Sequence, residues 1–353
     1  MLASIIIGNY NYGQYLGDAI ESALRQSYAN REVIVVDDGS TDRSHEVIEA
    51  FAHVIRPIFA EHRGQCACLN TGFAASRGDV VLFLDSDDSL HADALVNLMR
   101  PMRDDDRVVQ SQGYLEVVDK ARRKLGRRVP RRLPPSGDYR KRTLKRGFGA
   151  CQHPYTSGSL WRRRFLERVF PLPELISVLQ HKVYVGPDGY LNGVAQLFGR
   201  LVSVPSVVAD YRVHGQNIWH GATRFNAEAL RAHLATISHH TDYLLRWSTA
   251  LGYAPDGAEW RKWKGSWADN LAEFALSRLD ASESAPRFDA LVLAPFKAGA
   301  THPVKAVGLA AVLAAVWCAP KSAALNWSKR LLERKLPHLS NPRLSATSPP
   351  RGE

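Results

Sequence analysis

Three carboxylates follow a run of apolar residues in the first third of the chain. Asp85, Asp87 and Asp88 come directly after residues 80–84, whose sequence Val-Val-Leu-Phe-Leu is typical of a strand buried in a parallel sheet. Open α/β sheets bind ligands just beyond the carboxyl ends of their strands. Carboxylates at positions i and i+2 repel each other, and a divalent cation that also bridges to phosphates would relieve that repulsion. The alternative is a structural role, because Asp88 is a residue type that caps helices.

A second pair of carboxylates ends an earlier strand pattern. Asp37 and Asp38 follow an apolar run, and the strand pattern before it, residues 3–7, leads into a short segment that contains Tyr10. Strand and helix patterns alternate through the first third of the chain, which predicts an α/β fold with a doubly wound, mostly parallel sheet. Residues 108–118 alternate polar and apolar side chains and predict a small antiparallel hairpin beside that sheet.

The second half of the chain has a different character. Residues 120–146 are densely basic and contain several prolines, which predicts an exposed, mobile loop. Such a loop could clamp an anionic donor, face a lipid surface, or be only a solvated loop. The periodicity from residue 225 onward is helical, and the tail from residue 339 is rich in proline and serine, which is typical of disorder.

Composition limits the classes of protein that fit. The chain has 353 residues and a net charge of +11, so it can bury a large core and favours an anionic partner. Nucleic acid is not expected as that partner, because the basic run lacks interleaved aromatic residues. Four cysteines without a C-x-x-C pair suit a reducing compartment, and the N-terminus lacks the pattern of a signal peptide. We therefore expect a cytoplasmic protein.

One C-terminal segment could still bring the chain to a membrane. Residues 304–335 are apolar and then basic, an order that suits an amphipathic element on an anionic membrane face. This would place the protein at the inner face of the plasma membrane. The alternative is a buried helix followed by a surface helix.

The motifs together resemble a known enzyme family. In order and spacing they are similar to the inverting GT-A glycosyltransferases of family two. The segments that carry the resemblance are Asn9-Tyr10-Asn11, residues 32–42, residues 64–78 and residues 84–88, with weaker matches at residues 188–191 and 211–214. The resemblance implies a GT-A fold and an enzyme that moves a sugar from a nucleotide diphosphate sugar, with UDP as the favoured nucleotide, to an acceptor hydroxyl with inversion. The acceptor would be a glycan or glycolipid in cell-surface polysaccharide or glycolipid synthesis.

The resemblance also implies roles for individual residues. Tyr10 would border the nucleobase, and Asp38 would accept a hydrogen bond from the imide N–H of uracil. Asp85 would approach the ribose or the water shell of the metal. Asp87 would ligate Mn²⁺ or Mg²⁺ that bridges the diphosphate, and His214 would complete the metal shell. Packing for Tyr10 and a structural role for His214 are the alternatives.

Asp188 matches the general base of the family. It would take the proton of the acceptor hydroxyl, while the metal offsets the charge that builds on the leaving diphosphate. Its position at a predicted helix start also suits a simple cap. Two positions depart from the family pattern. Gly8-Asn9 precede the tyrosine where Pro-Thr or Thr-Ser is usual, and Pro187 precedes Asp188 where glutamate is common.

The resemblance, the helical periodicity and the composition of the tail together divide the chain into four expected regions. They are a nucleotide-sugar-binding half over residues 1–113, an acceptor-side half over 114–220 that includes the basic loop 120–146, a helical region over 221–338, and a disordered tail over 339–353.

Two other functions compete with glycosyl transfer. A catalytically inactive domain could keep the fold, bind a nucleotide and use its basic residues for partners. A phosphatase of the haloacid dehalogenase type would use Asp85 as nucleophile and Asp87 as acid, but that family places the motif on its first strand.

Overall fold

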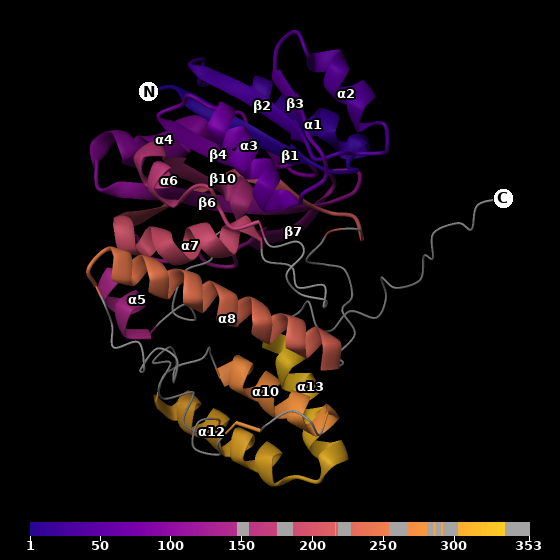
Figure 1. Ribbon diagram of the computed structural model, residues 1–353, viewed down its shortest axis with the longest axis vertical. Helices are drawn as coiled ribbons and strands as arrows, with labels where there is room; N and C mark the ends of the chain where they lie inside the picture. Colours follow the sequence, from indigo (N-terminus) through magenta and orange to yellow (C-terminus); the bar gives the residue numbers. More distant parts are fainter. Residues whose placement is uncertain are drawn as a thin grey trace, which may run out of the picture. The chain divides into compact units, whose positions relative to one another are not determined.

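The computed structural model divides the chain into two compact units, coloured by sequence in Figure 1. The first unit comprises Met1–Lys141, Cys151–Val178 and Val185–His214, and the second comprises Arg142–Ala150, Leu179–Tyr184 and Gly215–Glu353. The structure describes residues 1–146, 155–174, 186–215, 217, 227–253, 267–280, 285–286, 291 and 303–335. The predicted disordered tail, 339–353, and parts of the segment with helical periodicity from residue 225 onward lie outside the described residues.

A single mixed sheet forms the centre of the first unit. Its strand order is β3-β2-β1-β4-β9-β6-β10-β5, with β7 paired to β6 and β8 paired to β10. Strands β1, β2, β3, β4, β6 and β10 run in one direction, and the others run against them. The bounds are β1 Ala3–Asn9, β2 Arg31–Asp37, β3 Arg56–Phe59, β4 Val80–Asp85, β5 Ser89–Leu90, β6 Val108–Asp119, β7 Lys124–Val129, β8 Gly137–Asp138, β9 Ser159–Arg162 and β10 Arg200–Val213.

Helices cover both faces of this sheet, which is why its inner strands are apolar on both sides. Ile5 and Ile7 of β1 face the layer that contains helices α1 and α4, whereas Ile6 faces helix α3. The predicted α/β fold with a mostly parallel sheet is therefore confirmed. The helices of this unit are α1 Gly13–Leu24, α2 Ser44–Phe51, α3 Gln65–Ala75, α4 Ala94–Asp104, α6 Arg163–Val169 and α7 Pro187–Phe198. Helix α5, Arg140–Arg146, lies where the two units join along the chain.

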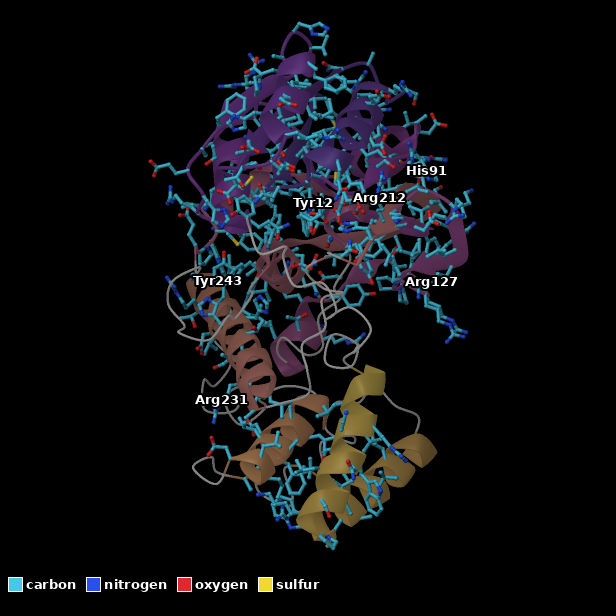
Figure 2. All side chains as sticks on the ribbon, turned by 90° about the vertical axis from the view of Figure 1, so that its right-hand side faces the viewer. Tyr12, His91, Arg127, Arg212, Arg231 and Tyr243 are labelled. Atoms are coloured by element: carbon cyan, nitrogen blue, oxygen red, sulfur yellow. The ribbon has the colours of Figure 1, made fainter. Side chains whose placement is uncertain are left out.

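The prediction that residues 120–146 form a loop is wrong for much of that segment. Strand β7 pairs antiparallel with β6, so the hairpin expected at residues 108–118 has its second arm in the basic segment, and α5 begins at Arg140. The hairpin turn forms because the Asp119 carboxylate accepts hydrogen bonds from the backbone N–H groups of Ala121 and Arg123, both at 2.9 Å. Strand β7 is exposed, as its basic sequence led us to expect, and Arg127 points away from the sheet (Figure 2). Basic side chains are common on such edge strands.

The apolar runs over residues 201–204 and 207–213, which are separated by Pro205 and Ser206 and predict two strands, form one strand, β10. The break that the sequence suggested is a local irregularity in register with β6, between Ser203 and Ala209. Pro205 lies inside it, and proline cannot donate a ladder hydrogen bond. The interruption therefore shifts the register without ending the strand.

The second unit is helical in its described residues. Its apolar core gathers side chains such as Leu230, Phe274, Leu313 and Leu332. The helices are α8 Ala227–Ala250, α10 Trp267–Leu279, α12 Pro303–Cys318 and α13 Lys321–Lys335. Among the described residues, no helix is both long and apolar enough to cross a bilayer. Helix α12 contributes Leu313 and Val316 to the core and exposes Val312.

Helix α3 packs closely on the sheet at one glycine, and this contact is testable. A Cβ atom at Gly72 would lie 2.4 Å from Cγ2 of Ile6 and 3.2 Å from Cγ2 of Val36. We expect Gly72→Ala to push α3 off the sheet and to destabilise the protein by about 1–3 kcal/mol. Thermal unfolding measures this as a lower Tm. The matched control is Gly137→Ala, where no atom lies within 4 Å of the new Cβ. Equal Tm values for the two variants would contradict the packing.

Candidate functional site

The polar residues predicted to act together lie at one edge of the sheet. Gly8 of β1 is in register with Asp85 of β4, and Asn9 is in register with Asp37 of β2. Parallel strands present their carboxyl ends at the same edge, so the segments after β1, β2 and β4 meet there. Strand β10 runs in the same direction through β6 and β9, which brings His214 to this edge as well.

Four carboxylates gather at this edge: Asp85, Asp87, Asp88 and Asp188. Burial, together with the charges of Asp87 and Asp188, raises the pKa of Asp85 to about 7. Burial also raises the pKa of Asp88 well above its usual range, with added repulsion from Asp87 and Asp85. Helix α7 thus carries Asp188 within electrostatic range of Asp85 at the end of β4.

A serine that the sequence did not single out holds this cluster. Ser157 Oγ donates a hydrogen bond to Asp88 at 2.7 Å and accepts one from the backbone N–H of Asp85 at 3.2 Å. Gln65 approaches Asp85 from the start of α3, with its Nε2 at 3.3 Å from the carboxylate. Short polar side chains of this kind carry no spacing signal, and Ser157 is 72 residues from Asp85 in the chain.

Arg212 is the second residue that holds the acidic segment in place. Its Nε donates to the backbone carbonyl of Asp87 at 2.8 Å, and its backbone N–H donates to the carboxylate of Asp88 at 3.0 Å. One guanidinium NH₂ group pairs with Asp18 of α1 at 2.6 Å, and the guanidinium stacks over the ring of Tyr15. Arg212 is buried and is labelled in Figure 2. The segment after β4 is therefore tied to α1 and to β10.

Asp87 and His214 form the pair that was predicted to hold a metal. His214 Nε2 lies 3.0 Å from Oδ2 of Asp87, and the His214 side chain is fully buried. The rings of Tyr12 and Tyr15 pack against the imidazole, with centroids at 5.5 and 4.5 Å. Burial and the charges of Asp87 and Asp85 raise the pKa of Tyr12. These rings fix the imidazole facing the carboxylate.

This donor set fits a divalent cation whose remaining ligands come from elsewhere. Within the described ranges, no group of three or more His, Cys, Asp or Glu side chains is arranged to hold a metal ion. Mg²⁺ is commonly bound by one or two carboxylates together with substrate phosphates and waters. A carboxylate oxygen and an imidazole nitrogen 3.0 Å apart therefore suit a metal that arrives with a diphosphate.

Asp188 lies in the first turn of α7. Pro187 begins the helix, a position that proline favours. Its carboxylate accepts a hydrogen bond from the backbone N–H of Gly189 at 2.9 Å, and burial raises its pKa. The pKa of Tyr155 is raised by burial and by the charge of Asp188, so this phenol lies within electrostatic range of the acidic cluster. The N-cap position of α7 is Gly186, so Asp188 is a first-turn acid of the helix and also a member of the cluster.

Tyr10 and Asp38 form a second corner of the same edge, joined by a residue that the sequence did not indicate. The ring of Tyr10 is 40% exposed and stacks on His62, with centroids 3.9 Å apart and an angle of 17° between planes. His62 Nδ1 lies 2.9 Å from the Asp38 carboxylate. That carboxylate also accepts hydrogen bonds from the backbone N–H groups of Arg63 and Gly64 at 2.9 and 2.7 Å.

The two acidic residues at the end of β2 have different contacts. Asp37 is fully buried and accepts from Asn9 at 2.8 Å and from the Ser40 hydroxyl at 2.6 Å, so it fixes the turn after its own strand. Asp38 holds the segment that leads into α3 and faces Tyr10 through His62. Alternation along the strand explains why adjacent carboxylates point to different surroundings.

The raised pKa of Asp85 makes stability depend on pH. The folded carboxyl titrates at about 7, whereas an unfolded aspartate titrates near about 4. Between these values the folded state binds more protons, so the free energy of unfolding falls as pH rises. Without divalent metal, we expect a loss on the order of 1–2 kcal/mol from pH 5 to pH 8, discounted because solvent reaches the carboxylate.

Thermal unfolding in EDTA at the two pH values measures this loss. Asp85→Asn should weaken the pH dependence, because the amide does not titrate, while Asp88 and Asp188 keep their raised pKa values. Asp93→Asn, at the exposed start of α4, is the control and should leave it unchanged. The same pH dependence in the Asp85→Asn protein would contradict the assignment.

Comparison with known proteins places the chain in a family. A family model described as Glycosyl transferase family 2 matches residues 4–170. A glycosyltransferase of Nostoc, alr2836, is 33% identical over 257 residues, which cover 72% of this chain and 77% of the relative. Glycosyltransferase GlyG of Streptococcus pneumoniae is 34% identical over 117 residues, covering 32% of this chain and 39% of the relative.

A solved structure shares the fold. The crystal structure of S. aureus TarS matches with a TM-score of 0.50 and 16% identity, covering 90% of this chain and 55% of that one. At this level of identity the likeness concerns the fold alone. The predicted GT-A glycosyltransferase fold and family are confirmed, and the phosphatase alternative is excluded by the family assignment. The chain belongs to glycosyl transferase family 2.

Proposed function

We propose that the protein transfers a sugar from a UDP-linked donor to a hydroxyl of a glycan or glycolipid acceptor, with inversion at the anomeric carbon. The observation that carries the proposal is the placement of Asp188 within electrostatic range of Asp85, at the edge where the segments after β1, β2, β4 and β10 meet. The proposed base, Asp188, and the acid proposed to lie beside the diphosphate, Asp85, would then act in the same site.

The two corners of the edge suit the two ends of a nucleoside diphosphate. Strand β1 separates the segment that carries Asp38 from the segment that carries Asp85, a spacing of about 10 Å for two strand intervals. The exposed face of Tyr10 can stack on a nucleobase, and Asp38 can accept from its imide N–H. The ribose and diphosphate would then extend past Asp85 toward Asp87.

Asp87 and His214 would hold Mn²⁺ or Mg²⁺. Such a cation supplies positive charge to the oxygens of the departing diphosphate. The protein contributes by fixing both metal ligands before the substrate arrives. Arg212 holds the backbone of Asp87, and Tyr12 and Tyr15 hold the imidazole of His214. Preorganised groups of this kind lower the cost of reorganisation during the reaction.

Asp188 would act on the acceptor. Its raised pKa makes the carboxylate a stronger base than an ordinary aspartate. The carboxylate takes the proton of the acceptor hydroxyl, and the oxygen attacks the anomeric carbon from the face opposite the diphosphate. The bond from that carbon to the diphosphate oxygen breaks with its electron pair, so configuration inverts and the nucleoside diphosphate leaves.

The substitution Asp188→Asn tests this role. We expect transfer from a panel of UDP sugars to fall by about 10²–10⁴-fold, because the amide cannot take a proton. Binding of UDP with Mn²⁺, measured by calorimetry, should change little. Retained turnover in Asp188→Asn would place the base elsewhere.

One control variant tests whether the loss of transfer reflects the loss of a base or only the loss of a negative charge. The activity of the wild type tests whether the protein catalyses transfer at all. Asp93→Asn removes an acid from the start of another helix, away from the proposed site, and should leave transfer unchanged. A wild-type protein that binds UDP with Mn²⁺ but neither transfers nor hydrolyses any donor would instead support the inactive binding domain.

A further inference from the structure

A cavity of 750 Å³ lies in the first unit, away from the acidic cluster. Arginines dominate its lining, together with one acid and two aromatic rings. The lining residues on which the argument rests are Arg107, Arg140, Arg164, Arg168, Arg200 and Phe198.

The cavity opens at the opposite edge of the sheet from the proposed donor site. Arg107 directly precedes β6, and Arg200 begins β10 in register with Val108. At the same edge, Arg162 at the end of β9 is in register with Val80 at the start of β4. These are the amino-terminal ends of the parallel strands, whereas Asp85 lies at the carboxyl end of β4. The two sites are therefore separated by the length of the strands.

Carboxylates neutralise only part of the charge around the cavity. Asp105 pairs with Arg107 at 3.1 Å and with Arg200 at 2.6 Å, and these partners hold its pKa well below the usual range. Asp138 lines the cavity, but one of its oxygens accepts a hydrogen bond from the backbone N–H of Arg140 at 2.8 Å. Five guanidinium groups thus have two acids beside them, Asp105 and Asp138.

Two of the arginines keep most of their donors for a ligand. Arg164 donates to the backbone carbonyl of Asp106, and Arg168 lies over the ring of Phe198, 5.7 Å from its centroid. Both side chains belong to exposed residues of α6. Within the described part of the chain, no carboxylate pairs with either guanidinium. Each planar fork can therefore bind two oxygens of one anion.

The aromatic part of the lining gives the cavity a second property. Phe165 is buried and packs edge-on against Phe198, with centroids 5.2 Å apart. Phe198 is partly exposed, so it offers an apolar wall next to the guanidinium groups. The volume falls within the range of small-molecule sites and exceeds what one phosphate fills. A phosphate that carries an attached organic group fits both the charge and the space.

We propose that this arginine cavity binds a phosphate-bearing ligand at a site separate from the donor site. Arg164 and Arg168 provide guanidinium forks for the phosphate oxygens, and Arg107, Arg140 and Arg200 supply further positive charge at the cavity wall. The ligand relieves the mutual repulsion of the arginines, so its binding stabilises the folded unit. The same chemistry is found in a free phosphate compound and in the headgroup of an anionic lipid.

The test uses the full-length protein in EDTA and inorganic pyrophosphate as the probe. EDTA keeps metal-dependent binding at the acidic edge out of the measurement. Calorimetry and thermal unfolding are run at constant ionic strength, with sodium chloride as the reference. We expect pyrophosphate to bind and to raise Tm in the wild type. The double variant Arg164→Ala with Arg168→Ala should weaken binding by at least about tenfold, because two charge-assisted contacts are lost.

Matched variants decide whether the effect belongs to the cavity. Arg25→Ala with Arg77→Ala removes the same charge from two arginines elsewhere, 76% and 78% exposed, and should leave pyrophosphate binding unchanged. Asp87→Ala alters the acidic edge and should also leave it unchanged. No binding by the wild type would overturn the proposal. Equal loss in the two double-arginine variants would do the same, because it would reduce the effect to net charge.

A vesicle assay distinguishes the two sources of phosphate. Vesicles of phosphatidylglycerol and phosphatidylcholine are sedimented with the wild type and with the Arg164→Ala, Arg168→Ala protein. Reduced sedimentation of the variant, together with its loss of pyrophosphate binding, supports a lipid headgroup as the ligand. Unchanged sedimentation with lost pyrophosphate binding supports a free phosphate compound. Pyrophosphate binding that survives in this variant overturns the proposal under either outcome.

Discussion

The repulsion among four carboxylates at one edge of the sheet is the constraint on which the rest depends. Asp85, Asp87, Asp88 and Asp188 repel one another. Ser157 and Arg212 hold the first three in place, and helix α7 carries Asp188. Burial and mutual charge raise the pKa of Asp85 to about 7 as a result. The protein therefore keeps unfavourable charge in place, and a cation with a diphosphate is the partner that we propose makes it favourable.

The sheet separates two regions of opposite charge. Acids collect at the carboxyl end of β4 and at the start of α7, while arginines collect around the cavity at the amino-terminal ends of β6 and β10. A site at each end can be occupied without competing for space, because the strands lie between them. The distribution of charged side chains between the two edges of the sheet is therefore more informative about function than the net charge of +11.

The sequence predicted which acidic residues lie at the carboxyl ends of the strands. It did not predict the contacts that residues from distant segments make with them. The apolar runs before Asp38 and Asp85 were enough to place both residues at one edge, and the family resemblance was confirmed. Ser157 and His62 had no signal, and Arg212 lay in a matched segment without a role assigned to it, because their roles come from contacts across 24 to 125 residues of chain. The hairpin over the basic segment was mistaken for a loop, since a strand that is exposed and basic lacks apolar alternation.

The most direct test of the central claim is a titration of the protein with Mn²⁺, followed by electron paramagnetic resonance, with and without UDP. If Asp87 and His214 share the cation with a diphosphate, UDP must tighten Mn²⁺ binding, and Mn²⁺ must tighten UDP binding by the same factor. We expect a gain of at least about tenfold, lost in Asp87→Ala. Mn²⁺ binding that is equal with and without UDP would contradict the claim that the acidic edge is a donor site.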